Sequence, residues 1–151
     1  MDDNKKLIDT VNHVIRINKD RVEGYKLAAR ESEDSDLKNL FSKFSADSMG
    51  YRQNLIAYIT TLGGEPAEDT TQQGKVFRAW MEIKKALTGR DRKAIIGSCE
   101  FGEDAALEAY DDALKADVVI PSDLREMLHQ QRLQIRLAHD QIKALRDQAH
   151  A

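Results

Sequence analysis

The 151-residue sequence contains one cysteine, Cys99, two prolines and eight glycines, and only 6% of its residues are aromatic. A single cysteine excludes an internal disulfide and is typical of a protein kept in a reducing compartment. The first residues, MDDNKKLID, lack the apolar core of a signal peptide. No apolar run approaches the roughly 18 residues that a membrane-spanning helix needs. We therefore expect a cytoplasmic location, and no membrane partner.

Charge of neither sign dominates. The chain has 26 acidic and 23 basic residues, for a formal net charge of −3, and the two signs are interspersed along it. No basic cluster offers the electrostatic footprint that nucleic acid requires, so we expect no nucleic-acid partner. The length suits one domain, residues 1–151, which is large enough to bury roughly 70% of its unfolded surface.

Apolar residues recur at spacings of three and four, which predicts amphipathic helices, and no alternating strand pattern competes with them. The sequence LGGEP can end one helix, because glycine adopts left-handed backbone angles and Pro66 cannot continue it. We therefore expect four long helices and one short one. The segments expected to be helical are 4–32, 35–62, 74–87, 92–116 and 122–148.

The lengths of the connections predict the topology. Short polar turns join the helices pairwise into two hairpins, residues 4–63 and 91–148. Between them lies a long crossover, residues 64–90, which contains the short helix. The stretch SDLKNLF of the first hairpin is echoed by SDLREML in the second. One long crossover between two hairpins is typical of an all-α, ferritin-like four-helix bundle with a fifth short helix in the crossover.

A carboxylate, Glu103, lies within the apolar stripe of the fourth expected helix. Ferritin-like di-iron sites take one Glu from each of two helices and a Glu-x-x-His motif from each of the other two. Here Asn18 stands where the first Glu would lie, and the inward-facing positions where the second and last helices would carry Glu-x-x-His read FSAD, MGYR, QRLQ and RLAH. We therefore expect no metal and no other cofactor. The alternative is a metal-binding protein, with either a di-iron centre or a mononuclear site of Glu100, Glu103 and His139 for iron or another divalent metal.

The position of Glu103 in the apolar stripe also predicts a polar layer inside the bundle. A buried carboxylate without a partner is costly, so we expect Glu103 to be hydrogen-bonded, paired or protonated, with Arg21, Arg52 and His139 as candidate partners. Replacing Glu103 by Gln should then cost only about 1 kcal/mol of stability. The residues expected in the buried polar layer are Asn18, Ser48, Tyr51, Glu103, Tyr110 and Gln131.

Motifs of catalysis are missing from the sequence. It contains no GxSxG, HExxH or CxxC and no glycine-rich phosphate loop. Cys99 lies on an apolar stripe, where a core residue is far more common than a nucleophile. We therefore expect no catalytic residues, and an enzyme is the less favoured interpretation.

Five stretches carry a resemblance to a known family: DRVEGYKLAA, LGGEP, FRAWMEIKKALTG, CEFGEDAALEAYDDAL and AHDQIKALRD. They resemble an uncharacterised bacterial family, a ferritin-like four-helix-bundle domain of unknown function. The resemblance extends over nearly the whole chain and implies a fold and a bacterial cytosolic setting, without an activity. The family tends to carry histidine before the Arg-x-Trp of the short helix, where this chain has Phe77, so no ligand role is expected there.

Three functions remain open. The first is a non-catalytic structural or interaction protein, in bacterial stress physiology, with a degenerate metal site. The second is a metal-binding protein, and the third is a small-molecule sensor or carrier with a cavity beside the polar layer. Apolar residues that project away from the bundle centre also predict a homodimer. These residues are Met49, Ile56, Leu133 and Leu137.

Overall fold

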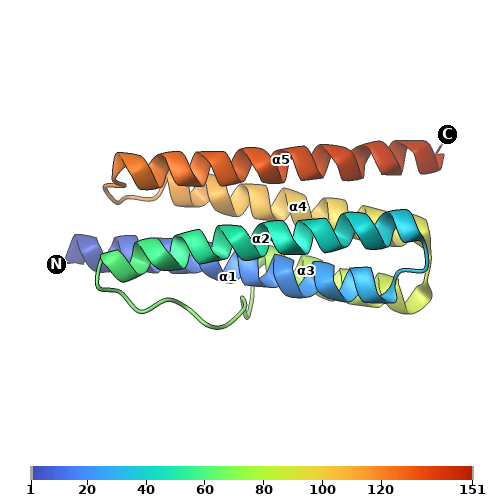
Figure 1. Ribbon diagram of the computed structural model, residues 1–151, viewed down its shortest axis with the longest axis horizontal. Helices are drawn as coiled ribbons and strands as arrows, with labels where there is room; N and C mark the ends of the chain where they lie inside the picture. Colours follow the sequence, from blue (N-terminus) through green and yellow to red (C-terminus); the bar gives the residue numbers. More distant parts are fainter. Residues whose placement is uncertain (1, 151) are drawn as a thin grey trace.

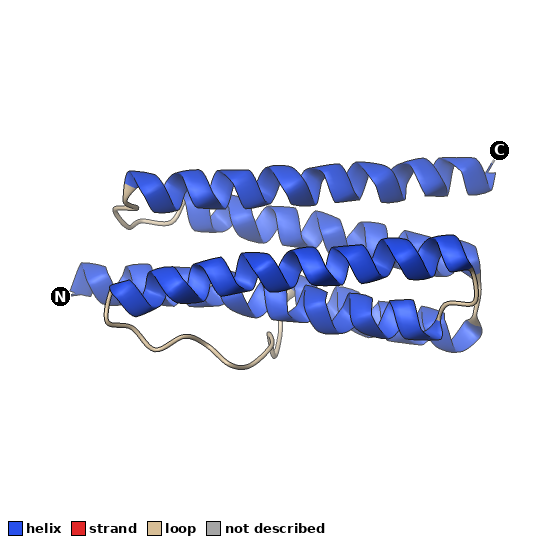
Figure 2. Ribbon diagram, in the orientation of Figure 1, coloured by secondary structure: helices blue, strands red, loops and turns tan. Residues whose placement is uncertain are grey.

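The computed structural model describes residues 2–150, and the side chains of residues 4–148. This part of the chain consists of helices joined by loops, with no strand, as the sequence predicts (Figure 2). None of its helices combines the length and the apolar character needed to cross a membrane. The five helices are α1 (Asp2–Glu31), α2 (Ser35–Thr61), α3 (Lys75–Gly89), α4 (Arg92–Leu114) and α5 (Ser122–His150).

The helices lie roughly along one long axis (Figure 1). α1 and α5 run in one direction, and α2 and α4 run in the other. α2 ends where α1 begins, and the following loop together with α3 returns the chain to the opposite end. α1 packs against α2, α3 and α4, whereas α5 packs mainly on α4 and touches α2 at fewer points.

The helix ends follow the local chemistry of the sequence. Gly63, just after α2, has φ +76°, a left-handed conformation that glycine adopts without steric cost. Asp91 caps α4, because its carboxylate accepts a hydrogen bond from the main-chain N–H of Lys93 at 3.1 Å. All five helices begin and end within two residues of the expected boundaries.

Aromatic side chains join three of the helices. Tyr25 of α1 stacks on Phe41 of α2 with ring centroids 5.6 Å apart, and it meets the edges of Phe44 and Trp80 at 5.3 and 5.0 Å. Trp80 belongs to the short helix α3 and lies over Gly24, where a Cβ atom would overlap the indole ring. The missing side chain at Gly24 therefore allows α3 to dock closely on α1.

Polar side chains of α1 hold the loop between α2 and α3. Asn12 donates from Nδ2 to the carbonyl of Glu65 at 3.0 Å and accepts from the main-chain N–H of Ala67 at 2.8 Å. Farther along the same face, Asp20 accepts hydrogen bonds from the main-chain N–H and the hydroxyl of Thr71. The crossover is thus fixed to the outside of α1, and this fixes where α3 begins.

Candidate functional site

The residues predicted to form a buried polar layer come from all four long helices. Five of them are buried: Asn18 of α1, Ser48 of α2, Glu103 and Tyr110 of α4, and Gln131 of α5. The sixth, Tyr51 of α2, is only half-buried, which corrects the sequence-based expectation. Its ring stays partly exposed because α2 and α5 meet at few points.

Glu103 forms a buried ion pair with Arg21. Nε and Nη2 of Arg21 donate to the two carboxylate oxygens of Glu103 at 2.8 and 2.7 Å, and Nη1 donates to the hydroxyl of Ser48. The Arg21 side chain is 1% exposed and that of Glu103 is 0% exposed. The guanidinium also lies 5.3 Å from the centre of the Tyr25 ring. The predicted arginine partner of Glu103 is thereby confirmed.

The two other candidate partners have different roles. Arg52 of α2 is half-buried and donates from Nη2 to the main-chain carbonyl of Ala67 at 3.3 Å. His139 of α5 faces acidic residues other than Glu103. Arg21 is therefore the partner of Glu103, because two nitrogens of its guanidinium donate to the two carboxylate oxygens.

A chain of hydrogen bonds crosses the rest of the layer. Asn18 donates from Nδ2 to the hydroxyl of Tyr110 at 2.7 Å, and that hydroxyl donates to Gln131 Oε1 at 2.7 Å. Gln131 then donates from Nε2 to the main-chain carbonyl of Tyr51 at 3.2 Å. Tyr51 thus takes part through its backbone rather than its ring. The hydrogen bonds connect α1, α4, α5 and α2 in turn.

Burial suppresses acid–base chemistry in this region. Burial, with the nearby Glu103 charge, raises the pKa of the Cys99 thiol far above its ordinary value. Burial likewise raises the pKa of Tyr110, although the hydrogen bond from Asn18 acts in the opposite direction. For Arg21, burial lowers the pKa, but the adjacent Glu103 carboxylate outweighs it, and the net shift is upward. Cys99, Tyr110 and Arg21 therefore keep their protons near neutral pH.

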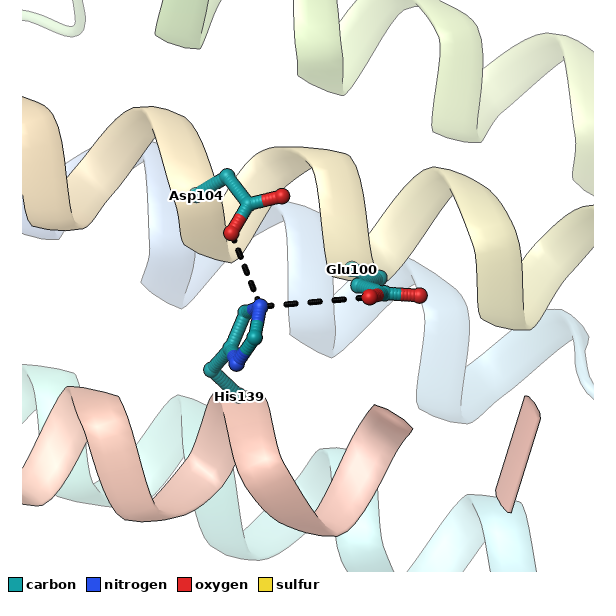
Figure 3. A group of neighbouring side chains, drawn as sticks. All are labelled: Glu100, Asp104 and His139. Carbon is teal, nitrogen blue, oxygen red and sulfur yellow. Dashed lines mark ion pairs between the residues drawn. The ribbon is translucent and has the colours of Figure 1, made fainter. Parts of the chain in front are cut away.

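A second group of polar side chains lies between α4 and α5 (Figure 3). His139 Nε2 is 2.8 Å from Asp104 Oδ1 and 3.9 Å from Glu100 Oε2. One ligand atom from each of Glu100, Asp104 and His139 lies within 4.8 Å of the other two. Of the mononuclear set predicted from the sequence, the structure brings together Glu100 and His139.

Glu103 does not belong to this group, and Asp104 takes its place, which corrects the predicted ligand set. At about 100° per residue, Asp104 returns to within about 40° of Glu100 on α4, whereas Glu103 points about 60° to the other side, toward Arg21. The i,i+4 spacing of Glu100 and Asp104 is the signal in the sequence that could have identified this pair.

Further charges surround the group. Arg146 Nη1 lies 2.8 and 2.9 Å from the two carboxylate oxygens of Glu100. The other ring nitrogen of His139, Nδ1, is 3.2 Å from Asp140 Oδ1. Asp140 is in turn 3.3 Å from Arg136 Nε. The imidazole is therefore oriented by carboxylates on both of its nitrogens.

A cavity of about 260 Å³ lies between α1, α4 and the start of α3. Its titratable lining residues are His13, Lys75, Glu108 and Asp112. None of the six residues of the predicted polar layer lines it. The small-molecule hypothesis asked for a cavity beside that layer, and this cavity does not meet that condition.

The family model described as "Domain of unknown function (DUF2383)" matches residues 6–116. The match includes most of α1 and all of α2, α3 and α4, so the polar residues of those helices lie within it, whereas Gln131 and His139 of α5 lie beyond it. A search of the curated proteins gave no match. The chain belongs to this family of unknown function.

Proposed function

We propose that α1, α2, α4 and α5 form a ferritin-like four-helix bundle within one domain of residues 1–151, and that α3 is part of its crossover. The helix directions support this: α2 and α4 run the same way, which requires a connection that travels the length of the molecule (Figure 1). The contacts of α1 with α2 and α4, and of α5 with the same two helices, are those expected around a four-helix core.

The proposed bundle is non-catalytic, and its centre is a degenerate metal site. The observation that carries this proposal is the Arg21–Glu103 pair. The carboxylate that faces the bundle centre is held through both oxygens by a guanidinium, which carries a permanent positive charge. Asn18 and Gln131 contribute neutral amides to the same layer. These residues do not fit a di-iron centre, because that centre needs several carboxylates and two imidazoles.

Energetics support the same proposal. A cation at Glu103 would have to displace Arg21, which is 1% exposed, from its partner. Removing one partner of a buried ion pair typically costs about 3–5 kcal/mol. Iron binding would have to overcome that cost before any gain.

We therefore propose a structural or interaction role in the bacterial cytoplasm, related to stress physiology, with the chain acting as a homodimer. Two leucines on the outer face of α5, Leu133 and Leu137, are each 50% exposed and lie one turn apart, and Met49 of α2 is 47% exposed. Exposed apolar strips of this kind tend to mark interfaces. Ile56 is half-buried and packs against the core, so it does not belong to such a strip, contrary to the expectation from the sequence.

Metal analysis combined with an iron-oxidation assay tests the non-catalytic role. The chain, purified without a metal-affinity step, is titrated with ferrous iron under argon and then exposed to air. We expect neither two iron ions per chain nor oxidation faster than in protein-free buffer. Binding of two iron ions that Glu103→Gln abolishes would overturn the proposal. The matched control is Glu108→Gln, which changes an exposed glutamate on the same helix.

A further inference from the structure

We propose that Glu100 and Asp104 of α4 and His139 of α5 form a binding site for one divalent metal ion of the zinc type. This site lies away from the Arg21–Glu103 pair and does not depend on the proposed role of the bundle. Asp104 did not enter the ligand set predicted from the sequence, and the packing of α4 against α5 brings it together with His139.

The distances from His139 to the two carboxylates fit a tetrahedral ion. Metal–ligand bonds of about 2.0–2.1 Å at tetrahedral angles place neighbouring ligand atoms about 3.3 Å apart. Here the distance from His139 Nε2 is 2.8 Å to Asp104 Oδ1 and 3.9 Å to Glu100 Oε2. The two distances bracket the required value. The Asp104 side chain is 59% exposed, so it can move by the small amount that the ion needs.

The orientation of His139 is a second, independent observation. The residue is 8% exposed, and its Nε2 points at Glu100 and Asp104 (Figure 3). Its Nδ1 lies 3.2 Å from the carboxylate of Asp140. Metal-binding histidines characteristically donate from the nitrogen that does not bind the metal to a carboxylate, which fixes both the tautomer and the ring orientation. Asp140 is placed to do this for His139.

The chemistry of the ligands selects the class of metal. Two carboxylates with one neutral imidazole balance the double charge of the ion. Imidazole favours zinc and its transition-metal neighbours, whereas calcium takes six to eight oxygen ligands. Because Asp104 is largely exposed, solvent water can reach the ion as the fourth ligand.

Arg146 competes with the metal for Glu100. Its Nη1 lies 2.8 and 2.9 Å from the Glu100 carboxylate, while its Nη2 lies 3.2 Å from Asp147. The Arg146 side chain is 36% exposed, so it can keep its contact with Asp147 and release Glu100. A metal ion must therefore displace a partly exposed ion pair in order to bind Glu100. This lowers the affinity of the site for the metal but does not prevent binding.

Calorimetric titration of the untagged, EDTA-treated full chain with zinc chloride tests the site. We expect one zinc ion per chain. His139→Ala and Asp104→Asn should each weaken binding by at least about 10-fold, the size of effect that even outer residues of a metal site produce. Arg146→Gln should tighten binding by roughly 2- to 5-fold, because it removes a competing, partly exposed ion pair.

The control is His129→Ala, which removes an exposed histidine from the same helix and should leave zinc binding unchanged. Circular dichroism checks that each variant is folded. Asp104→Asn keeps the proposal testable even if the buried His139 proves necessary for folding, since Asp104 is exposed. Failure of the wild-type chain to bind zinc, or binding that Asp104→Asn leaves intact, would overturn the proposal. So would equal losses in His129→Ala and His139→Ala.

Discussion

At the scale of single residues, Glu103 and Arg21 depend on each other. Replacing Glu103 by Gln keeps the shape of the side chain but removes the charge that Arg21 pairs with inside the protein. The small cost expected from the sequence alone therefore no longer holds. We predict that Glu103→Gln lowers the free energy of unfolding by about 3–5 kcal/mol, the typical cost of breaking a buried ion pair from one side. Urea denaturation followed by circular dichroism measures this change.

Two controls accompany this prediction. Glu108→Gln changes a residue of the same helix as Glu103 and breaks an exposed pair with Lys75 of α3. Surface changes of this kind are usually within about 0.5 kcal/mol of neutral. The double variant Arg21→Met, Glu103→Met removes both charges and should recover most of the lost stability, since apolar replacements of buried pairs are often neutral. A Glu103→Gln variant as stable as the Glu108→Gln variant would contradict the buried pair.

The sequence predicted much of this site and missed a part for a physical reason. Helical periodicity was sufficient to place Glu103 inside and to propose an arginine partner. It could not choose among the three candidate partners, because Arg21 has a long side chain whose direction depends on the packing of α1 against α4. Asp104 was missed because it is 59% exposed and gains a partner only when His139 of another helix approaches.

At the scale of elements, the docking of α3 on α1 depends on Gly24. A Cβ at this position would overlap the six-membered ring of Trp80. We predict that Gly24→Ala lowers stability by about 1–3 kcal/mol, the usual cost of overpacking, although alanine is the better helix former. Trp80 is the one tryptophan of the chain, so a shift of its fluorescence reports displacement of α3 directly.

Gly97 of α4 provides the matched control. A Cβ at Gly97 would meet no atom within 4 Å, so Gly97→Ala should raise stability by up to about 1 kcal/mol through helix propensity. If both alanine variants shift the midpoint of thermal unfolding in the same direction, the close approach of α3 to Gly24 is wrong.

The crossover loop has its own pH dependence through Asp20. Burial raises the pKa of Asp20 from 3.8 to about 6, even though hydrogen bonds from Thr71 act to lower it. The folded state thus binds this proton more tightly than the unfolded state. Asp20 therefore contributes stability that is fully present below about pH 4 and is lost as the pH rises to about 6.

We predict that Asp20→Asn removes this loss, since the amide oxygen still accepts from Thr71 and no charge has to be buried. The difference in unfolding free energy, variant minus wild type, should grow by on the order of 1–2 kcal/mol between pH 4 and pH 7. Denaturation at a series of pH values measures it. Asp69→Asn is the control, because the hydrogen bond from Arg16 lowers the pKa of Asp69 and moves its titration below this window. A constant difference across the series would contradict the prediction for Asp20.

The sequence predicted that residues 64–90 form a crossover but not what holds it in place. The composition predicts a polar loop, and the length of the connection predicts that it runs from one end of the helices to the other. The hydrogen bonds that Asn12 and Asp20 make to it join residues more than 50 positions apart, and their side chains show no periodic signal. Gly24 gave no signal either, because a glycine within a helix is tolerated for many reasons.

At the scale of the whole molecule, the exposed leucines of α5 predict association. Light scattering at micromolar concentration should give a mass twice that of one chain. Leu133→Asp together with Leu137→Asp should give a monomer, since the two side chains lie on one exposed strip and are each 50% exposed. Met81→Asp changes an equally exposed apolar residue on α3 and should leave the mass unchanged. A monomeric wild-type chain would rule out the homodimer. A double variant that remains a dimer would rule out this strip as the dimer interface.

The first turn of α1 and the last turn of α5 lie at opposite ends of the long axis (Figure 1). A pulling force applied between the two ends therefore acts along the helices and not across them. The contacts between neighbouring helices would have to slide past one another together, because no end of the molecule is free to peel apart contact by contact. The buried ion pair and the hydrogen bonds that link the four long helices would share this shear load. A force between the two ends would therefore be resisted in shear, by contacts along the whole length of the helices.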